Sequence, residues 1–182
     1  MDIIHNIEHF KKALRILRLH QKYANNLRSY EKDKFNDIEF RPGRARDLKA
    51  IEQLHLRTFR IPLLNFLRWV YRFKAMELVS VACDKEGRII AYDLFMFEES
   101  EISEKILHEL YVAVDPEYQD KGIATALRRY SVRAYAQKRT LKGLSTLARP
   151  HDIKALRTAQ SAGYAITKAA AKPYAYYLYQ AL

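Results

Sequence analysis

The chain has 182 residues, of which 49% are hydrophobic and 29% are charged. This length and composition predict one globular domain with an extension and exclude an intrinsically disordered chain. Lys and Arg number 32 against 21 Asp and Glu, and the net charge of +11 favours anionic partners such as nucleotide phosphates, nucleic acid or anionic lipid.

Cysteine and glycine usage excludes several other classes of protein. Cys83 is the only cysteine, so no intramolecular disulfide can form, and a reducing, cytoplasmic environment fits. It lies in an apolar run typical of a strand, so we expect a buried structural thiol. The five glycines do not form a Rossmann or P-loop fingerprint. No apolar run approaches the roughly 20 residues of a membrane-spanning helix.

Residues 1–35 contain no proline or glycine and are predicted to form a basic amphipathic helix, an N-terminal extension of the domain. Two interpretations remain open. The helix packs against its own domain or against a second subunit in a homodimer, or it makes peripheral contact with an anionic membrane surface. His5 and His9 share a helix face, but they have no third ligand nearby, so we predict no metal site.

Residues 36–182 are predicted to form the main domain, in which strands and helices alternate. The expected elements are a strand over 38–41, a helix capped by Asp47, a helix opened by Pro62, strands over 78–84 and 88–98 joined by the turn Lys85-Glu86-Gly87, a strand over 106–114, a helix over 123–137, a strand over 143–148, a helix over 153–161 and a closing strand over 173–179. This order predicts an α/β (α+β) fold with a mixed central sheet and helices on both faces.

The most informative stretch runs from residue 106 to residue 137. Val, Tyr and Leu predict a strand that Asp115-Pro116 ends, and apolar residues recur at helical spacing after Gly122. A one-glycine turn between a strand and a helix aims backbone N–H groups, and the positive end of the helix dipole, at one point. That point suits a phosphate, because Gly122 permits close approach and Lys121 adds positive charge nearby.

This stretch resembles motif A of the GNAT superfamily of acetyl-CoA-dependent N-acetyltransferases. The motif is Gln or Arg, two residues, Gly, one residue, then Gly or Ala, here Gln119, Gly122 and Ala124. The preceding strand, the Asp-Pro-Glu-Tyr link and the following helix also match. The resemblance covers Ile38 to the C-terminus and implies a GNAT-like, mostly antiparallel sheet. It also implies that acetyl-CoA is held by Val112, Ala113, Val114, Gln119, Asp120, Lys121, Gly122, Ile123, Ala124, Thr125 and Asp152.

Acetyl transfer to an amine requires a base, because a primary alkylamine with a pKa of about 10 is protonated at neutral pH. The candidates are His108 and Glu109. Consecutive strand residues face opposite ways, so at most one of them points into the site. His108 shares its parity with the side chains of Val112 and Val114, and a bulge between them would exchange the two candidates.

The family usually has a tyrosine that protonates the departing CoA thiolate, and that position is Ala159 here. Tyr111, Tyr164 or solvent would then supply the proton. The resemblance implies direct transfer to a primary amine of a small molecule, with an amino sugar as one candidate. The helices after Asp47 would help to wall the acceptor site with Arg57, Phe59, Arg60, Arg68 and Arg72. The alternatives are a peptide or protein amine, a CoA-binding module without turnover, and a platform for membrane or, less favoured, nucleic acid.

Overall fold

The computed structural model describes residues 14–171 and 174–182. Its strands are β1 (Asp33–Phe35), β2 (Ile38–Pro42), β3 (Val79–Cys83), β4 (Ile89–Met96), β5 (Ile106–Val114), β6 (Gly143–Ala148), β7 (Ala165–Ala171) and β8 (Tyr174–Ala181). Its longer helices after the N-terminal segment are α2 (Leu48–Phe59), α3 (Asn65–Leu78), α4 (Ile123–Ala136) and α5 (Ile153–Ser161).

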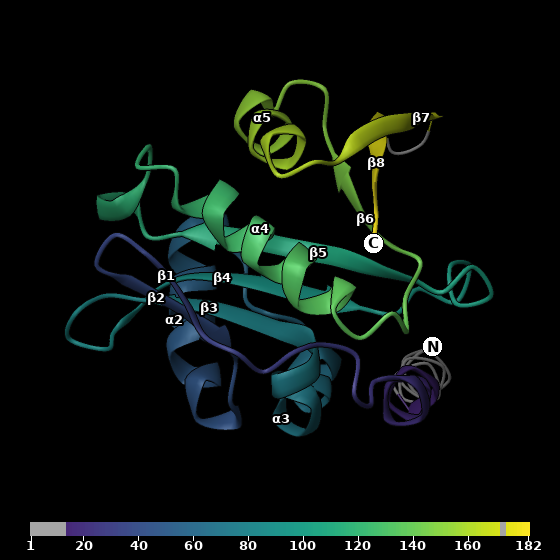
Figure 1. Ribbon diagram of the computed structural model, residues 1–182, viewed down its shortest axis with the longest axis horizontal. Helices are drawn as coiled ribbons and strands as arrows, with labels where there is room; N and C mark the ends of the chain where they lie inside the picture. The colour runs from purple at the N-terminus through teal and green to yellow at the C-terminus, as the bar shows by residue number, and fades with distance from the viewer. Residues whose placement is uncertain (1–13, 172–173) are drawn as a thin grey trace, which may run out of the picture.

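The described strands form one sheet in the order β1-β2-β3-β4-β5-β6-β8-β7. Every neighbouring pair is antiparallel except β5 and β6, which are parallel. Helices α2 and α3 cover one face of the sheet, and α4 crosses the other face with α5 beside it (Figure 1). The predicted mixed, mostly antiparallel sheet with helices on both faces is therefore confirmed.

Helix α4 is held on the sheet by the apolar stripe that its sequence predicts. Ile123, Leu127, Tyr130 and Ala134 are all buried. Burying a large apolar side chain contributes about 1.5–3 kcal/mol, so this stripe fixes the start of the helix next to the end of β5.

Strands β5 and β6 separate part of the way along their length. Their pairing runs from Ile106 opposite Gly143 to Glu109 opposite Thr146, and β5 then continues to Val114 with no partner on that side among the described strands. The hydroxyl of Thr146 donates to the Glu109 carbonyl at 3.0 Å, at the point where the strands part. One edge of β5 is therefore open over its last five residues.

A β-bulge lies at the same point. Leu94 of β4 pairs with Tyr111 and Phe95 pairs with Glu109, so Leu110 is the extra residue on β5. Because side chains alternate along a strand, the bulge reverses the parity of the residues before it. Glu109 consequently faces the same side as Val112, which is the side of α4.

The N-terminal segment differs from its prediction. Residues 14–23 are helical, but the helix ends there and does not reach Phe35, so that prediction was wrong. Asn26 has a φ of 52°, in the left-handed region that asparagine tolerates, and the Asn25 amide donates to the Gln21 carbonyl at 3.1 Å. The predictions for residues 1–13, with His5 and His9, lie outside the described residues.

The chain after this helix packs into the domain. Ala24, Leu27 and Arg28 are buried, and Arg28 donates to the Val79 carbonyl and to Ser80 Oγ at 3.2 and 2.7 Å. Residues 33–35 then add strand β1 to the sheet. These contacts agree with the interpretation of a segment packed on its own domain. Within the described ranges, no helix has the length and apolarity needed to cross a bilayer.

Two further elements depart from the sequence prediction. Helix α3 begins at Asn65, and Pro62 lies in the link before it. Strand β7 was not predicted, because its sequence is rich in alanine, a residue that favours helices over strands. It is a strand because it pairs with β8, from Ala165 opposite Tyr179 to Ala171 opposite Tyr174.

Candidate active site

A cavity of about 330 Å³ opens where the end of β5, the turn before α4, the last turn of α2 and the start of α5 meet. Most of the predicted cofactor-binding residues line it: Val112, Ala113, Val114, Gln119, Asp120, Gly122, Ile123, Ala124 and Asp152. Thr125 and Lys121 are not among its lining residues. Lys121 Nζ instead donates to the Glu117 carbonyl at 2.9 Å and lies over the Tyr118 ring.

The turn before α4 presents a row of backbone N–H groups. Asp120 and Gly122 have positive φ angles of 59° and 77°, and the Gln119 side chain ties the turn to the Val114 carbonyl at 3.1 Å. Within the described residues, the N–H groups of residues 120–125 donate to no protein acceptor; the first amide of α4 to do so is that of Ala126, which donates to Gly122. These free donors at the positive end of a helix can bind an anion.

The start of α5 forms the opposite wall of the cavity. Lys154 and Arg157 line it, and Lys154 Nζ lies 3.0 Å from Asp120 Oδ1 across the opening. Asp152 caps the helix, since its Oδ1 accepts from the Ala155 amide at 2.9 Å. The sequence analysis missed both cations. Their spacing of three residues on a predicted helix was a usable signal, because it places them on one face.

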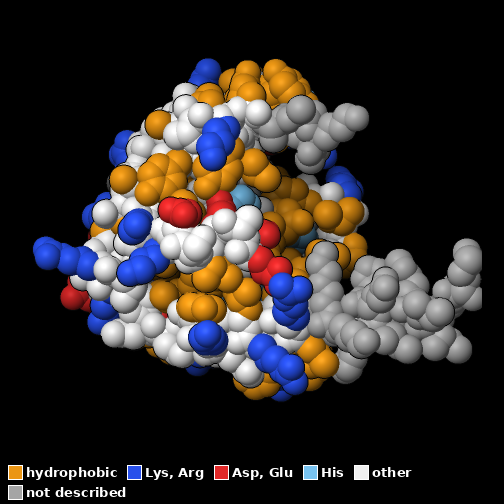
Figure 2. Space-filling view, turned by 90° about the vertical axis from the view of Figure 1, so that its right-hand side faces the viewer, with side chains coloured by type: hydrophobic (Ala, Val, Ile, Leu, Met, Phe, Trp, Pro, Cys, Tyr) orange, Lys and Arg blue, Asp and Glu red, His pale blue; other side chains and the backbone are white. Residues whose placement is uncertain are grey.

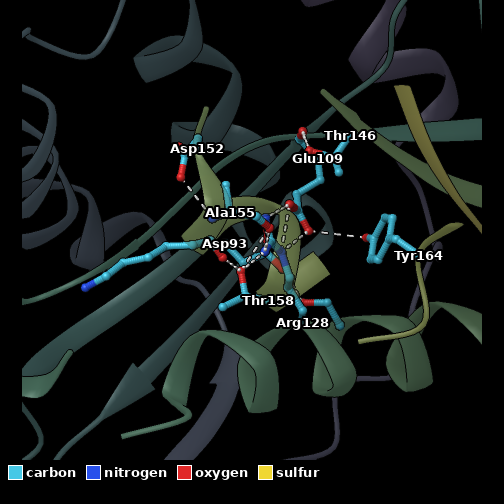
Figure 3. A network of polar contacts seen from close by, with 10 residues as sticks. Asp93, Glu109, Arg128, Thr146, Asp152, Ala155, Thr158 and Tyr164 are labelled. Carbon is cyan, nitrogen blue, oxygen red and sulfur yellow. Dashed lines mark hydrogen bonds and ion pairs between the residues drawn. The ribbon is translucent and has the colours of Figure 1, made fainter. Parts of the chain in front are cut away.

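Glu109 belongs to a buried ionic network on the α4 side of the sheet (Figure 3). Arg128 Nη2 and Nε donate to Glu109 Oε1 at 2.7 and 3.0 Å, and the Tyr164 hydroxyl donates to Oε2 at 3.2 Å. Burial and, next, Glu109 raise the pKa of Tyr164 well above its usual value. Arg128 also contacts Thr158 and the Ala155 carbonyl, so this network joins β5, α4 and α5.

Asp93 lies fully buried on β4 beside this network. Its Oδ2 accepts from Ser131 Oγ at 2.8 Å, and its Oδ1 has no hydrogen-bond partner among the described residues. Burial and, next, the charge of Glu109 raise the pKa of Asp93 well above its usual value. The carboxyl group therefore holds its proton far more tightly than a solvated aspartate does.

His108 lies on the opposite face of β5, in a second polar cluster. Its Nδ1 is 2.8 Å from Ser145 Oγ on β6 and 3.5 Å from Glu101 Oε2 in the turn before β5. Ser145 Oγ donates to Glu101 Oε2 at 3.0 Å, and the Tyr177 hydroxyl donates to Glu101 Oε1 at 2.5 Å. Burial alone would raise the pKa of Glu101, but the hydrogen bonds from His108, Tyr177 and Ser145 outweigh it and lower that pKa.

No local sequence pattern pointed to Glu101 or Ser145, and Tyr177 was expected only as a packing group or as part of a tyrosine-lined acceptor wall. Only the pairing of β5, β6 and β8 brings them together, so the sequence held no local signal for them. Figure 2 faces the end of the molecule that carries the turn before β5, and it shows a hollow with hydrophobic side chains inside and acidic side chains at its edge. The two candidate bases have different neighbours: Glu109 contacts Arg128 of α4, and His108 contacts Ser145 in the second cluster. Their side chains lie on opposite faces of β5.

The proposed acceptor wall is only partly available. Arg57 pairs with Asp115 at 2.8 Å, and Arg68 pairs with Glu52 at 2.6 Å. Phe59 lines the cavity and packs on Tyr111, with ring centroids 5.3 Å apart. In a regular strand Tyr111 and Glu109 would face the same side of the sheet. The extra residue Leu110 lies between them, so Tyr111 faces the side of His108 instead.

Comparisons with known proteins agree with this geometry. The family model described as "Acetyltransferase (GNAT) family" matches residues 48–164. A search of curated proteins gives no significant match.

Three solved structures show the same fold at low sequence identity. The NatC complex bound to Gag peptide and CoA contains a chain with a TM-score of 0.67 and 19% identity, covering 80% of this chain and 99% of that one. Ribosomal-protein-S5-alanine acetyltransferase from Vibrio fischeri gives 0.65 and 14%, covering 84% and 96%. Spermidine N-acetyltransferase from Vibrio cholerae, which is dodecameric, gives 0.64 and 16%, covering 81% and 95%.

Proposed function

Because the chain belongs to the acetyltransferase (GNAT) family, we propose that it moves the acetyl group of acetyl-CoA directly to a primary amine of a small molecule. The observation that carries the proposal is the combination of unpaired amides at residues 120–125 with an open edge of β5 that begins in the same cavity.

The cavity residues support binding of CoA at the turn before α4. A pyrophosphate would accept hydrogen bonds from the free amides of residues 120–125 and gain from the helix dipole. Lys154 and Arg157 add positive charge on the facing wall. The pantetheine arm carries amide groups, and these would pair with the open edge of β5 as a short additional strand.

The contacts of the two candidate bases favour His108 over Glu109. Glu109 is 2% exposed, and both of its oxygens already accept from Arg128 and Tyr164. A carboxylate held in this way is a structural anion and has no free position for a substrate proton. His108 keeps Nε2 free of any hydrogen bond to the described residues, one residue before the strands part.

The leaving thiolate has no tyrosine at the usual position. Ala159 is fully buried, and the Tyr164 hydroxyl is engaged by Glu109. Tyr111 stays on the acceptor side of the sheet, packed on Phe59. We therefore propose that the thiolate is protonated from solvent or by the imidazolium of His108 and not by a dedicated tyrosine.

The solved structures of similar fold include both a peptide complex and a spermidine N-acetyltransferase, so they do not distinguish between acceptor classes. We therefore infer the acceptor class from this chain's own residues. The turn beside His108 carries four glutamates: Glu98, Glu99, Glu101 and Glu104. A protonated amine is attracted to such an acidic edge. This favours a small cationic amine as the acceptor, with amino sugars and polyamines as the first classes to test.

The test is thiol release from acetyl-CoA in the presence of a panel of amines. Polyamines, amino sugars and short peptides with free N-termini should be compared at equal concentration. We expect release with at least one small amine and little with the peptides. Release with peptides alone would overturn the small-molecule assignment, and CoA binding without release on any amine would favour the non-catalytic module.

A further inference from the structure

The hydrogen bonds of Glu101 and Ser145 decide which nitrogen of His108 carries a proton. An ionised carboxylate can only accept hydrogen bonds, so the single proton of the Ser145 hydroxyl is used in its 3.0 Å bond to Glu101 Oε2. The same hydroxyl oxygen lies 2.8 Å from His108 Nδ1 and must accept there. Nδ1 is therefore the protonated nitrogen of the neutral ring.

The second nitrogen of His108 then has a free lone pair. In neutral imidazole one nitrogen donates and the other accepts. Nε2 has no hydrogen-bond partner among the described residues, so nothing in that part of the chain uses its lone pair. A base for an incoming amine needs this arrangement.

Glu101 also has a charge that no strong cation neutralises. It is 8% exposed, and no Lys or Arg of the described residues forms an ion pair with it; its charged neighbour is His108. Burial and, next, the hydrogen bond to Glu101 raise the pKa of Tyr177 to about 12, so Tyr177 stays a neutral donor. Buried carboxylates are normally paired with a cation, and here the protonated ring of His108 would be that cation.

We propose that Ser145 and Glu101 are positioning residues that hold His108 as the Nδ1-protonated tautomer and stabilise its imidazolium once Nε2 has taken the proton of the acceptor amine. This inference rests on the proposed function. It assigns roles to residues on β6 and in the turn before β5, outside the cavity that would hold CoA.

The step balances in atoms and charge. The acceptor ammonium gives one proton to Nε2, and its nitrogen then forms a C–N bond to the thioester carbonyl carbon. The C–S bond breaks and the electron pair leaves with sulfur. The nitrogen loses a second proton, so that one of the two protons ends on the thiolate and the other goes to solvent.

The tautomer can be measured without any activity. Two-dimensional ¹⁵N–¹H NMR of the histidine rings distinguishes a protonated from an unprotonated nitrogen, and His108→Gln identifies the His108 signals by their loss. At a pH high enough for the ring to be neutral, we expect a protonated Nδ1 and an unprotonated Nε2. Ser145→Ala should produce a mixture of the two tautomers. A wild-type ring protonated on Nε2 would overturn the proposal, whether or not the protein turns over acetyl-CoA.

Kinetics supply the second test. Loss of the base in His108→Gln should lower kcat by about 10²–10⁴-fold. Glu101→Gln should lower kcat at least about tenfold, leave KM for acetyl-CoA unchanged, and move the acid limb of the pH–rate profile to lower pH, because the protonated ring loses its counter-charge. Glu86→Gln, an exposed glutamate on the β3–β4 hairpin and outside both sites, is the control for loss of one negative charge and should behave as wild type.

These outcomes separate the two levels of the argument. An active wild type in which Glu101→Gln and Glu86→Gln have the same kcat and the same pH profile would refute the positioning role and leave the proposed function standing. A wild type that releases no thiol with any amine would refute the proposed function, and the NMR measurement would still decide the tautomer.

Discussion

Gly122 has a backbone conformation that most side chains disfavour, in the turn where the phosphate is proposed to bind. Its φ is 77°, and a Cβ there would meet only Phe35, at 3.8 Å. We expect Gly122→Glu to abolish CoA binding, because the added side chain brings bulk and negative charge to the free amides. Isothermal titration calorimetry with CoA would measure this, and the variant should remain folded.

Gly87 provides a matched control for this prediction. It lies in the β3–β4 hairpin with a φ of 78°, and an added Cβ has no neighbour within 4 Å. Gly87→Glu therefore carries the same backbone strain and the same charge change as Gly122→Glu, away from the cavity. CoA affinity should be unchanged in it. Equal losses in both variants would mean that the effect is general, and unchanged affinity in Gly122→Glu would refute the phosphate turn.

Asp93 should make stability fall as the pH rises. Its pKa is raised in the folded state, so the folded protein binds this proton more tightly than the unfolded chain. The stabilisation is complete below the unfolded pKa of about 4 and is lost at up to about 1.4 kcal/mol per pH unit as the pH rises towards the folded pKa. Asp93→Asn removes this titration.

The measurement is urea unfolding of wild type and Asp93→Asn between pH 5 and pH 8. We expect the difference in the free energy of unfolding to grow with pH in favour of the variant. Other titrating groups are common to both proteins and cancel in the difference. A difference that stays constant over this range would show that Asp93 does not titrate as its burial and the charge of Glu109 imply.

At the scale of single elements, the bulge in β5 explains why the sequence could not choose the base. Strand parity predicted that only one of His108 and Glu109 faces the side of Val112, and it named His108. The extra residue Leu110 reverses this, and Glu109 takes that side. A bulge depends on register with a neighbouring strand, which local propensity does not encode. His108 remains the proposed base because of its contacts and not because of strand parity. Arg128 and Tyr164 occupy both oxygens of Glu109, whereas the contact of His108 with Ser145 uses only Nδ1.

The N-terminal segment shows the same limit of local patterns. Its apolar spacing predicted one helix through Phe35, whereas burial of Ala24 and Leu27 against the domain ends the helix at residue 23. Strand β7 is the converse case, since its alanines favour a helix and pairing with β8 overrides them. Elements with strong period and clear turn residues, such as α4 and the β3–β4 hairpin, were predictable.

Leu27 tests how firmly this segment is bound to the domain. It is 3% exposed, and Leu27→Ala should lower the free energy of unfolding by about 2–5 kcal/mol through loss of buried surface and the cavity that remains. Leu14 in the preceding helix is 36% exposed, so Leu14→Ala should change the free energy of unfolding by no more than about 0.5 kcal/mol. Chemical denaturation compares them. Equal small effects would mean that residues 24–31 are a dispensable tail.

At the scale of the whole molecule, the open edge of β5 connects two sites on opposite faces. The cavity with the free amides lies by α4 and α5 and reaches the last turn of α2, and the cluster of His108, Ser145 and Glu101 lies on the face of β5 opposite Glu109. The fold and the cofactor turn were predictable because motif A is contiguous in sequence. The second cluster was not, because it combines a turn, β5, β6 and β8 through long-range pairing.

Two sites on opposite faces predict that both substrates are bound at once and that the acetyl group never rests on the protein. Cys83 is the chain's one thiol; it is 4% exposed, burial raises its pKa, and it lies on β3 away from the cavity. Double-reciprocal plots against amine concentration should therefore intersect, and Cys83→Ala should keep the wild-type kcat. Intact-mass analysis after incubation with acetyl-CoA alone should find no acetylated protein. Parallel lines together with a stable acetyl adduct would contradict direct transfer, because both results require a covalent acetyl-enzyme intermediate. The chain's one thiol, Cys83, is buried and cannot readily form such an intermediate.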